Sequence, residues 1–245
     1  MHLSVIIPAY NEEKRLSNTL REINKYLSKQ SYDSEILVVN DGSKDRTAQI
    51  VKDLKLEIAN LKLIDNKLNQ GKGAVVRQGM LEARGEYRLF TDADNSTSIN
   101  HLEKMWPLFE KGYDVVIGSR DSRDIKEACQ AVSQPLWKRL AGDIGNIAIQ
   151  VVLIWGIWDT QCGFKGFTKK AAEDIFKKCK INRWAFDVEA LALAKKLGYK
   201  IGIVPVYWIN APESRVKLKG YINFFKEFLR IKWNFICHKY DYEEN

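Results

Sequence analysis

The chain has 245 residues, of which 45% are hydrophobic and 29% are charged, the composition of an ordered globular protein. This length can bury a full core, and no stretch reaches the roughly 18–20 apolar residues of a membrane-spanning helix. The formal net charge of +8 favours anionic partners such as nucleotide phosphates, nucleic acid or an anionic membrane surface. The four cysteines form no CxxC pair, which indicates reduced thiols in a cytosolic protein.

The first half of the chain alternates strand and helix patterns. The continuous apolar run at 3–7 is typical of a strand buried on both faces, and Leu16, Leu20, Ile23 and Leu27 recur at helical spacing. In chain order, we expect strands at 3–7, 35–40, 61–64, 87–90 and 114–117, and helices at 12–27, 45–56 and 71–83. This alternation predicts an α/β protein with a Rossmann-like, mostly parallel sheet and helices on both faces.

The second half is more varied. Residues 144–158 are almost wholly apolar and predict either a core helix or an interfacial one. A loop and strand at 159–167, a helix at 187–197 and a strand at 201–208 follow. Residues 221–237 predict an amphipathic helix that mixes aromatic with basic side chains. We therefore expect one domain over 1–218, and over 219–245 a basic aromatic C-terminal helix that could serve at a membrane interface.

The polar loops follow the expected strands. They lie at 8–12, 41–45, 69–73, 91–97 and 118–120. In open α/β sheets, ligands bind beyond the carboxyl ends of the strands. Each loop taken alone has a plain structural interpretation, but their convergence at one sheet edge favours a common ligand site.

Asp92 and Asp94 follow the expected strand at 87–90. On extended backbone, residues i and i+2 project to the same side, so both carboxylates could reach one cation. Mg²⁺ is held by one or two carboxylates, with substrate phosphates and water completing its shell. The alternative is structural, because Asp and Asn are also common in turns and helix caps.

Two further loops have suitable chemistry for a nucleotide. Asp41 ends a buried strand and could accept hydrogen bonds from a base or ribose, or it could form an Asx turn. The segment NQGKG at 69–73 places Lys72 between two glycines at a helix start. Free backbone amides and the helix dipole would attract phosphate there, although the spacing is not that of a Walker A loop.

These motifs together resemble a known family. VIIPAYNE at 5–12, VNDGS at 39–43, NQGKG at 69–73 and DAD at 92–94 are similar in order and spacing to family 2 glycosyltransferases, which have the GT-A fold. Later segments, GSR at 118–120, DTQCGFK at 159–165, WAFDVE at 184–189 and VPV at 204–206, resemble the polyprenyl-phosphate subgroup. Dolichyl-phosphate β-glucosyltransferases are the most similar, and the mannosyltransferases come next.

The resemblance implies roles for particular residues. The nucleotide-sugar site would comprise Pro8, Ala9, Tyr10, Asn11, Glu12, Asp41, Gly42, Ser43, Gly71, Lys72, Asp92 and Ala93. Asp92 and Asp94 would hold Mg²⁺ or Mn²⁺. Catalysis would involve these two together with Arg120 and Asp187, and the acceptor phosphate would face Arg120, Arg139, Lys165 and Arg215.

The implied reaction is a metal-dependent, inverting transfer of a hexose, with UDP-glucose as the expected donor. The acceptor would be a polyprenyl or dolichyl phosphate at the cytoplasmic face of a membrane, with no nucleic acid involved. A lipid phosphate needs no general base, because its second pKa is ~6 and it is largely a dianion at neutral pH. Asp187 and Glu189 would then orient sugar hydroxyls or a neighbouring cation such as Arg183, unless Asp187 is simply a helix N-cap.

Several alternatives remain open from the sequence. GDP-mannose could be the donor, or a saccharide hydroxyl the acceptor, in which case Asp187 or Glu189 would act as an indispensable base. A non-catalytic basic protein that binds membrane or nucleic acid is a remote alternative. Eukaryotic members of the subgroup carry a membrane helix before the first strand. The segment APESRV at 211–216 also differs from the corresponding family sequence, which tends to contain a glycine. Lipid identity and oligomeric state are undetermined.

Overall fold

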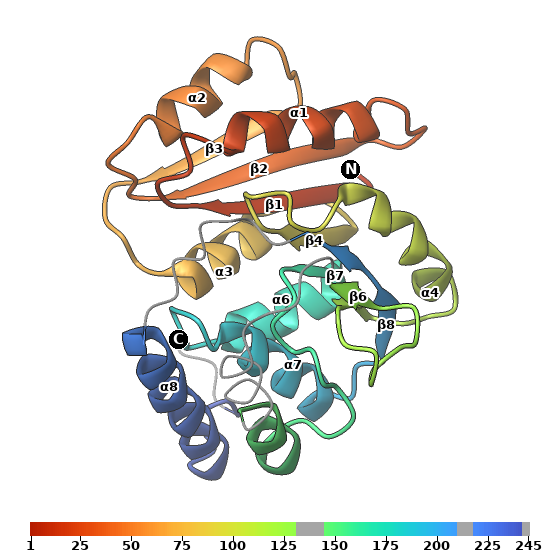
Figure 1. Ribbon diagram of the computed structural model, residues 1–245, viewed down its shortest axis with the longest axis vertical. Coiled ribbons are helices and arrows are strands. Elements are labelled where there is room, and N and C mark those ends of the chain that lie inside the picture. The colour runs from red at the N-terminus through yellow and green to blue at the C-terminus, as the bar shows by residue number, and fades with distance from the viewer. Residues whose placement is uncertain (131–144, 210–217, 242–245) are drawn as a thin grey trace.

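Seven strands form one twisted sheet in the order β3-β2-β1-β4-β7-β5-β8 (Figure 1). The computed structural model describes residues 1–130, 145–209 and 218–241. The strands are β1 (Leu3–Ala9), β2 (Ser34–Asp41), β3 (Leu61–Asn66), β4 (Tyr87–Thr91), β5 (Val115–Ser119), β7 (Phe164–Thr168) and β8 (Ile201–Pro205). All run parallel except β7, which is antiparallel to both β4 and β5.

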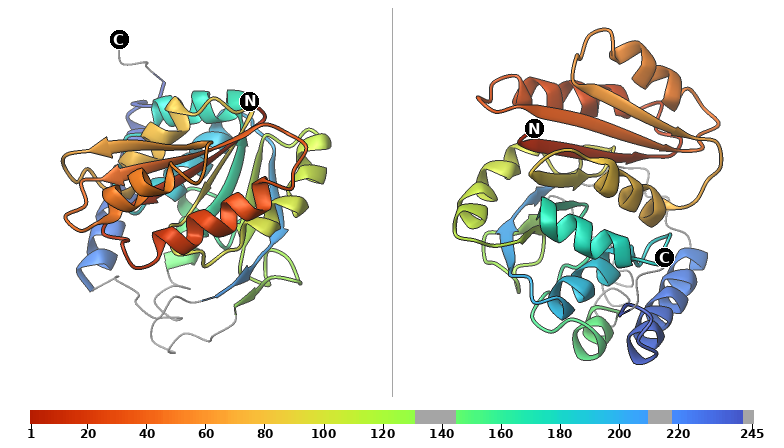
Figure 2. Two further views of the ribbon diagram at one scale, coloured as in Figure 1. Left: turned by 90° about the horizontal axis from the view of Figure 1, so that it is seen from above. Right: turned by 180° about the vertical axis from the view of Figure 1, so that it is seen from behind.

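Helices cover both faces of this sheet, as predicted (Figure 2). They are α1 (Leu16–Leu27), α2 (Thr47–Leu54), α3 (Lys72–Glu82), the 3₁₀ helix η1 (Ile99–Lys104), α4 (Trp106–Glu110), α6 (Lys169–Lys178), α7 (Phe186–Lys196) and α8 (Leu218–Ile236). A further helix spans 145–152. Two short strands, β6 (Cys129–Gln130) and β9 (Tyr207–Trp208), pair outside the main sheet.

The core consists of two apolar layers, one on each face of the sheet. Along β1, Ile6 packs into the layer beneath α3, α6 and α7, whereas Val5 and Ile7 pack into the layer beneath α1 and α2. This alternation is the period-two pattern of a strand. Because both faces are covered, β1 reads as the continuous apolar run that identified it in the sequence.

Several expected elements differ from the observed ones. The first helix begins at Leu16 rather than at 12, and the apolar segment 144–158 is helical only at 145–152 among its described residues. Helix α6 was not predicted, although Ala171, Ala172 and Ile175 are fully buried. The apolar stripe of α6 is narrow because it contains two small alanines among many lysines. The helical periodicity of the sequence is therefore weak in this segment.

The C-terminal helix α8 packs on the core through one side. Phe228 and Ile231 belong to the same apolar layer as Leu191 of α7. In the described part of the chain, no helix is long and apolar enough to cross a bilayer.

Candidate active site

Five polar loops gather at one edge of the sheet. They follow β1, β2, β3, β4 and β5, which run in the same direction and so send their carboxyl ends to the same side. In sheets of this kind, ligands bind beyond those ends. The structure therefore brings together the loops at 8–12, 41–45, 69–73, 91–97 and 118–120 that the sequence singled out.

Asp92 directly follows β4, and its carboxylate is held between a glycine and a lysine. A Cβ added at Gly163 would lie 2.0 Å from Asp92 Oδ2, so a larger residue there would require the carboxylate to move. On the other side, Lys72 Nζ lies 2.5 Å from Asp92 Oδ1. The same ammonium lies 5.9 Å from the ring centres of Phe90 and Phe186. Asp92 is therefore closely packed and already paired with a cation.

Asp94 lies in a turn, not on extended backbone as expected. Its Oδ1 accepts a hydrogen bond from the Ser96 amide at 3.0 Å, and its Oδ2 lies 3.7 Å from Arg15 Nη1. Arg15 is itself held by two hydrogen bonds of 2.8 Å to the Glu12 carboxylate. Each aspartate of the D-x-D segment thus faces a different cation of the protein.

The charge of Lys72 is sustained by its surroundings. Burial lowers the pKa of Lys72, but the carboxylates of Asp92, Asp187 and Asp94 oppose it and leave that pKa above its usual value. Lys72 therefore carries its positive charge at neutral pH and balances the carboxylates around it.

Asp41 organises the glycine loop that follows β3. Its Oδ1 accepts a hydrogen bond from the Gln70 amide at 2.6 Å, and its Oδ2 accepts hydrogen bonds from the Gly71 amide at 3.0 Å and from Asn69 Nδ2 at 2.8 Å. Burial raises the pKa of Asp41, although the hydrogen bonds from Gln70 and Gly71 lower it. The predicted contact of Asp41 with the nucleoside stays a prediction, because the described partners of this carboxylate all lie in the loop.

Most of the amides that we expected to be free at the start of α3 have partners within the protein. Besides Gln70 and Gly71, the amides of Gly73 and Ala74 donate to the carbonyls of Arg183 and Asn182 at 3.2 and 3.0 Å. A Cβ added at Gly71, where φ is +102°, would lie 2.4 Å from Asn182 O. The glycines therefore serve the close packing of α3 against residues 181–183. The positive group that this loop presents is the Lys72 ammonium.

The loops after β1 and β2 are tied to each other. The Asn11 amide donates to Ser43 Oγ at 2.9 Å, and Asn11 Oδ1 accepts from the Lys44 amide at 2.9 Å. Asn11 adopts a left-handed conformation with φ of 55°, which asparagine tolerates better than most residues. Pro8 and Ala9 are buried, whereas Tyr10 is 39% exposed.

The predicted role of Lys165 in binding the acceptor phosphate needs correction. Lys165 is completely buried on β7, and its ammonium donates hydrogen bonds to Asp187 Oδ1 at 2.6 Å and to Cys162 O at 2.5 Å. Asp187 lies in the first turn of α7, whose N-cap is Ala185, so Asp187 is not the N-cap. Burial raises the pKa of Asp187, while Lys165 and Lys72 lower it.

Glu189 is a structural residue. Its carboxylate accepts hydrogen bonds from the amides of Lys180 and Ile181 at 3.0 and 2.9 Å and from the Tyr240 hydroxyl at 2.6 Å. The side chain has no exposed surface. These contacts join the loop before α7 to the C-terminal segment and leave Glu189 inaccessible from the surface.

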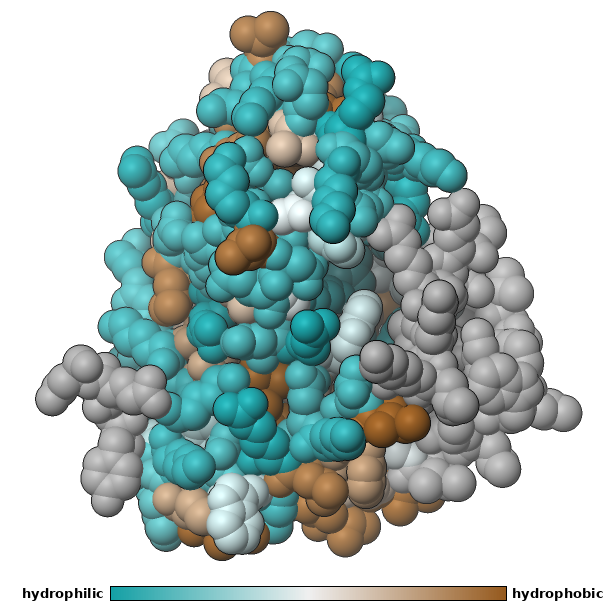
Figure 3. Space-filling model, turned by 90° about the vertical axis from the view of Figure 1, so that its left-hand side faces the viewer, coloured by the Kyte–Doolittle hydropathy of each residue, from teal (hydrophilic) through white to brown (hydrophobic). Residues whose placement is uncertain are grey.

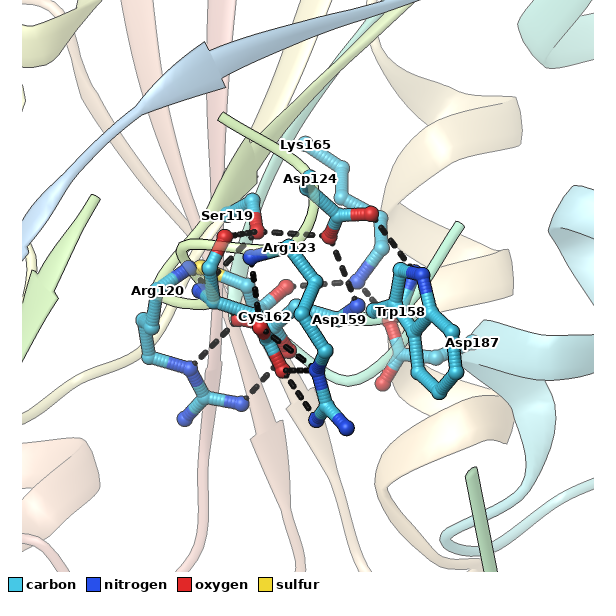
Figure 4. Close-up of polar contacts among 10 residues, drawn as sticks. Ser119, Arg120, Arg123, Asp124, Trp158, Asp159, Cys162, Lys165 and Asp187 are labelled. Atoms are coloured by element: carbon cyan, nitrogen blue, oxygen red, sulfur yellow. Dashed lines mark hydrogen bonds and ion pairs between the residues drawn. The ribbon is translucent and has the colours of Figure 1, made fainter. Parts of the chain in front are cut away.

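Arg120 follows β5 and forms a bidentate pair with Asp159 (Figure 4). Its Nε, its Nη2 and its backbone amide all donate to the Asp159 carboxylate at 2.8 Å. The Trp208 ring centre lies 5.3 Å from the guanidinium carbon. Burial lowers the pKa of Arg120, but the charge and hydrogen bonds of Asp159, together with Cys162 and Asp92, leave that pKa above its usual value. No described residue accepts a hydrogen bond from Nη1, which leaves this group for a ligand.

A partly buried aspartate, Asp124, holds the segment that carries Asp159 (Figure 4). Asp124 accepts hydrogen bonds from the amides of Trp158 and Asp159 at 2.7 and 2.8 Å and from Ser119 Oγ at 2.7 Å. Sequence reasoning assigned no role to Asp124, Asp159, Trp208, Arg15 or Gly163. Only Asp159 and Gly163 lay in a quoted motif, and their partners are distant in the sequence. Arg139 and Arg215 lie outside the described residues.

The described residues suit a divalent cation held jointly with a ligand. Asp92 and Asp94 supply carboxylate oxygens, which Mg²⁺ and Mn²⁺ prefer. Within 1–130, 145–209 and 218–241, no group of three or more His, Cys, Asp or Glu side chains could form a metal site alone. A cation at these aspartates would therefore need further oxygens from a bound diphosphate and water.

Comparison with known proteins identifies relatives of the chain. The family model described as glycosyl transferase family 2 matches residues 4–176. A dolichyl-phosphate beta-glucosyltransferase of Trichomonas vaginalis is 38% identical over 242 residues, which cover 94% of this chain and 73% of that protein. A dolichyl-phosphate beta-glucosyltransferase of Dictyostelium discoideum is 36% identical over 248 residues, which cover 96% and 75% of the two chains.

A solved structure gives the same fold. Glucosyl-3-phosphoglycerate synthase from Mycobacterium tuberculosis, in complex with Mn²⁺, uridine diphosphate and phosphoglyceric acid, matches with a TM-score of 0.67 at 15% identity. The match covers 94% of this chain and 78% of that one. The likeness confirms the predicted α/β architecture of GT-A type.

Proposed function

This chain belongs to glycosyl transferase family 2 and is a glycosyltransferase, and we propose that it transfers glucose from UDP-glucose to a polyprenyl or dolichyl phosphate. The names of the relatives support this choice of sugar and acceptor. Family membership also sets aside the non-catalytic alternative. The proposed reaction is a single displacement at the anomeric carbon of the sugar. An acceptor phosphate oxygen bonds to this carbon while the bond between the carbon and the donor diphosphate breaks, and the configuration of the carbon is inverted.

One observation favours a phosphate acceptor over a hydroxyl acceptor: the candidate bases are already occupied. Asp187 is bonded to Lys165, Glu189 accepts three hydrogen bonds, and Asp159 is bound by Arg120. A sugar hydroxyl would need a free base to take its proton. A phosphate dianion needs only a cation, and a guanidinium matches its geometry. In this proposal Arg120 binds the acceptor through Nη1, while Asp159 and Trp208 hold the guanidinium in place.

The donor would bind at the opposite side of the same edge. Asp92 and Asp94 would hold Mg²⁺ or Mn²⁺, which neutralises charge that develops on the leaving diphosphate. Lys72 would add a second positive charge beside it. The loops at 8–12 and 41–43 would bind the nucleoside, and the exposed Tyr10 ring could stack on a base. Asp187 would orient sugar hydroxyls through its fixed pairing with Lys165.

The lipid acceptor requires a position at a membrane, and α8 offers a surface for it. We define the apolar face of α8 as its five exposed apolar side chains, Ile222, Phe225, Leu229, Trp233 and Ile236, which are 50–59% exposed. In Figure 3, brown side chains gather at the end of the molecule where Figure 1 places α8. Lys226, Arg230 and Lys232 accompany this face. We propose peripheral attachment at the cytoplasmic leaflet through this face.

A transfer assay tests the proposal. Purified protein with Mn²⁺ would be given UDP-glucose or GDP-mannose as donor and polyprenyl phosphate or a free saccharide as acceptor. We expect glucosyl transfer from UDP-glucose to the lipid phosphate, abolished by excess EDTA and by Asp94→Ala. Transfer to the saccharide alone would establish the hydroxyl-acceptor alternative instead, and transfer from GDP-mannose alone would overturn the donor assignment.

Arg120→Ala examines the acceptor site within the same assay. We expect transfer to lipid phosphate to fall by roughly 10²-fold, as when one positioned donor is removed from an active site, while UDP binding is unchanged. Arg21→Ala is the matched control, because Arg21 forms an exposed pair with Glu57 away from the site. Equal activity of the two variants would contradict the assignment of Arg120.

A further inference from the structure

Both oxygens of the Asp92 carboxylate have a close neighbour in this structure, while the side chain stays 35% exposed. Oδ2 packs against Gly163 so closely that a methyl group there would overlap it. Oδ1 lies 2.5 Å from the Lys72 ammonium. A divalent cation approaching Asp92 would therefore meet a positive charge already in contact with Oδ1.

Lys72 is the partner that can move. It is the first residue of α3, its side chain is 23% exposed, and Asp92 is its only ion-pair partner among the described residues. The Lys165–Asp187 pair differs, since both side chains are buried and Lys165 is also bonded to a backbone carbonyl. A long, partly exposed lysine can swing to a new anion at little cost, whereas the shorter Asp92 side chain stays at the end of β4 beside Gly163.

We propose that Lys72 is a built-in counter-ion that keeps divalent cations off Asp92 until a nucleotide diphosphate provides the ammonium with another partner. A cation entering alone would bring like charges together at one carboxylate. When the diphosphate enters with it, Lys72 can release Asp92 and bind a phosphate oxygen. This inference rests on the proposed donor site and adds that metal and nucleotide load together. Such coupling is reciprocal between the two ligands.

Manganese binding without nucleotide distinguishes this role from simple phosphate binding. The affinity of Mn²⁺ alone would be measured by electron paramagnetic resonance or calorimetry for wild type and for Lys72→Met. We expect the variant to bind Mn²⁺ about tenfold more tightly, within the roughly 5- to 150-fold usual for coupled sites. Its affinity for UDP in the presence of Mn²⁺ should fall. If Lys72 only binds phosphate, the variant loses affinity for UDP while its affinity for Mn²⁺ alone stays that of wild type. That result would overturn the proposal.

Lys170→Met is the matched control. Lys170 pairs with Asp174 at 2.6 Å on the surface of α6, so this substitution removes the same kind of ion pair outside the site. We expect its Mn²⁺ affinity to equal that of wild type. Lys72→Gln removes the charge but keeps a polar end, and it serves as the second variant if Lys72→Met does not fold.

The wild-type protein supports a measurement that needs no substitution. Acetylation of Lys72 by a limited amount of acetic anhydride would be quantified by mass spectrometry, with Lys170 as the internal reference. Saturating Mn²⁺ without nucleotide should displace the ammonium and raise its reactivity, whereas Mn²⁺ with UDP should protect it. Unchanged reactivity of Lys72 at saturating Mn²⁺ would refute the counter-ion role.

Different binding results would contradict the proposed donor site and the counter-ion role of Lys72. If wild type binds no Mn²⁺ and UDP even when both are present, the proposed donor site is wrong. If it binds both together and Lys72→Met leaves the affinity for Mn²⁺ alone unchanged, only the counter-ion role is wrong. The transfer assay reports on the proposed function independently of either result.

Discussion

The position of Asp92 depends on one missing methyl group. Gly163 stands where a Cβ would reach within 2.0 Å of the Asp92 carboxylate, and its carbonyl accepts a hydrogen bond from the Asp92 amide at 3.2 Å. No positive φ requires a glycine there, so the requirement comes from space alone. A residue of the loop before β7 thus fixes the side chain at the end of β4.

Gly163→Ala should displace the Asp92 carboxylate without unfolding the protein. The side chain can rotate away from the new methyl group, so we expect the free energy of unfolding to fall by about 1 kcal/mol, at the low end for overpacking. The affinity for UDP with Mn²⁺ should fall about tenfold, which corresponds to ~1.4 kcal/mol. Calorimetry and urea denaturation measure the two effects. Gly145→Ala is the control, because a Cβ at Gly145 meets no atom of the described residues within 4 Å. Equal nucleotide affinity in both variants would contradict this account.

At the scale of elements, α8 is joined to the proposed active site through the start of α7. Glu227 Oε2 accepts hydrogen bonds from the amides of Trp184 and Ala185 at 3.0 Å each. A carboxylate at a helix N-terminus satisfies unpaired amides and interacts favourably with the helix dipole. Asp187 lies two residues further on, so the helix that we propose for the membrane also holds the turn that carries Asp187.

Glu227→Ala should destabilise the protein by about 1–2 kcal/mol, the loss usual for a helix capping interaction. The amides of Trp184 and Ala185 would lose a charged acceptor, and α8 would lose an anchor. Urea denaturation measures the change in unfolding free energy. Glu22→Ala, on the exposed side of α1, should stay within about 0.5 kcal/mol of wild type. Similar stabilities of the two variants would show that the contact of α8 with α7 contributes nothing measurable.

At the scale of the whole molecule, exposed apolar side chains are concentrated around α8. The helix at 145–152 lies beside it, with Lys232 Nζ 3.4 Å from Val152 O. This neighbour adds Val151, which is 73% exposed, and Trp155 just beyond it is 77% exposed. Phe228 is buried on the opposite side of α8, so the same helix packs on the core and presents a second apolar side outward.

The apolar face of α8 should bind anionic liposomes. We expect wild type to sediment with vesicles that contain phosphatidylserine and to be released by added salt, because each basic residue near such a surface contributes about 1 kcal/mol and is screened within ~8 Å at physiological ionic strength. Phe225→Asp with Trp233→Asp should weaken binding more than tenfold, since burying each ring is worth about 1.5–3 kcal/mol. Sedimentation assays give both values.

Leu56→Asp is the control for these substitutions. Leu56 is 92% exposed and lies just after α2, so this variant adds a charge to an exposed apolar position away from α8. Point variants are preferable to removal of the helix, because truncation would uncover the core around Phe228 and Ile231. Wild type that stays in the supernatant at low salt would disprove the membrane proposal.

The sequence by itself determined the layered α/β architecture and the edge that carries the site. Apolar runs and helical periodicities are local, and parallel strands send their following loops to one edge whatever the details of packing. The D-x-D segment, the glycine loop and Arg120 could therefore be placed together from their order alone. The strand patterns at 3–7 and 87–90 also gave β1 and β4 almost to the residue.

Only the tertiary structure decided which charged groups pair. Asp187 bonds to Lys165, 22 residues away, and Arg120 bonds to Asp159, 39 residues away. Such pairs arise because β7 enters the sheet antiparallel between β4 and β5, a long-range arrangement that no local pattern encodes. Long-range packing also pairs the amides of Gly73 and Ala74, at the start of α3, with carbonyls of residues 182 and 183, and it positions Lys72 beside Asp92. The residue types of the site can therefore be identified from the sequence, whereas the residues that they pair with depend on long-range packing.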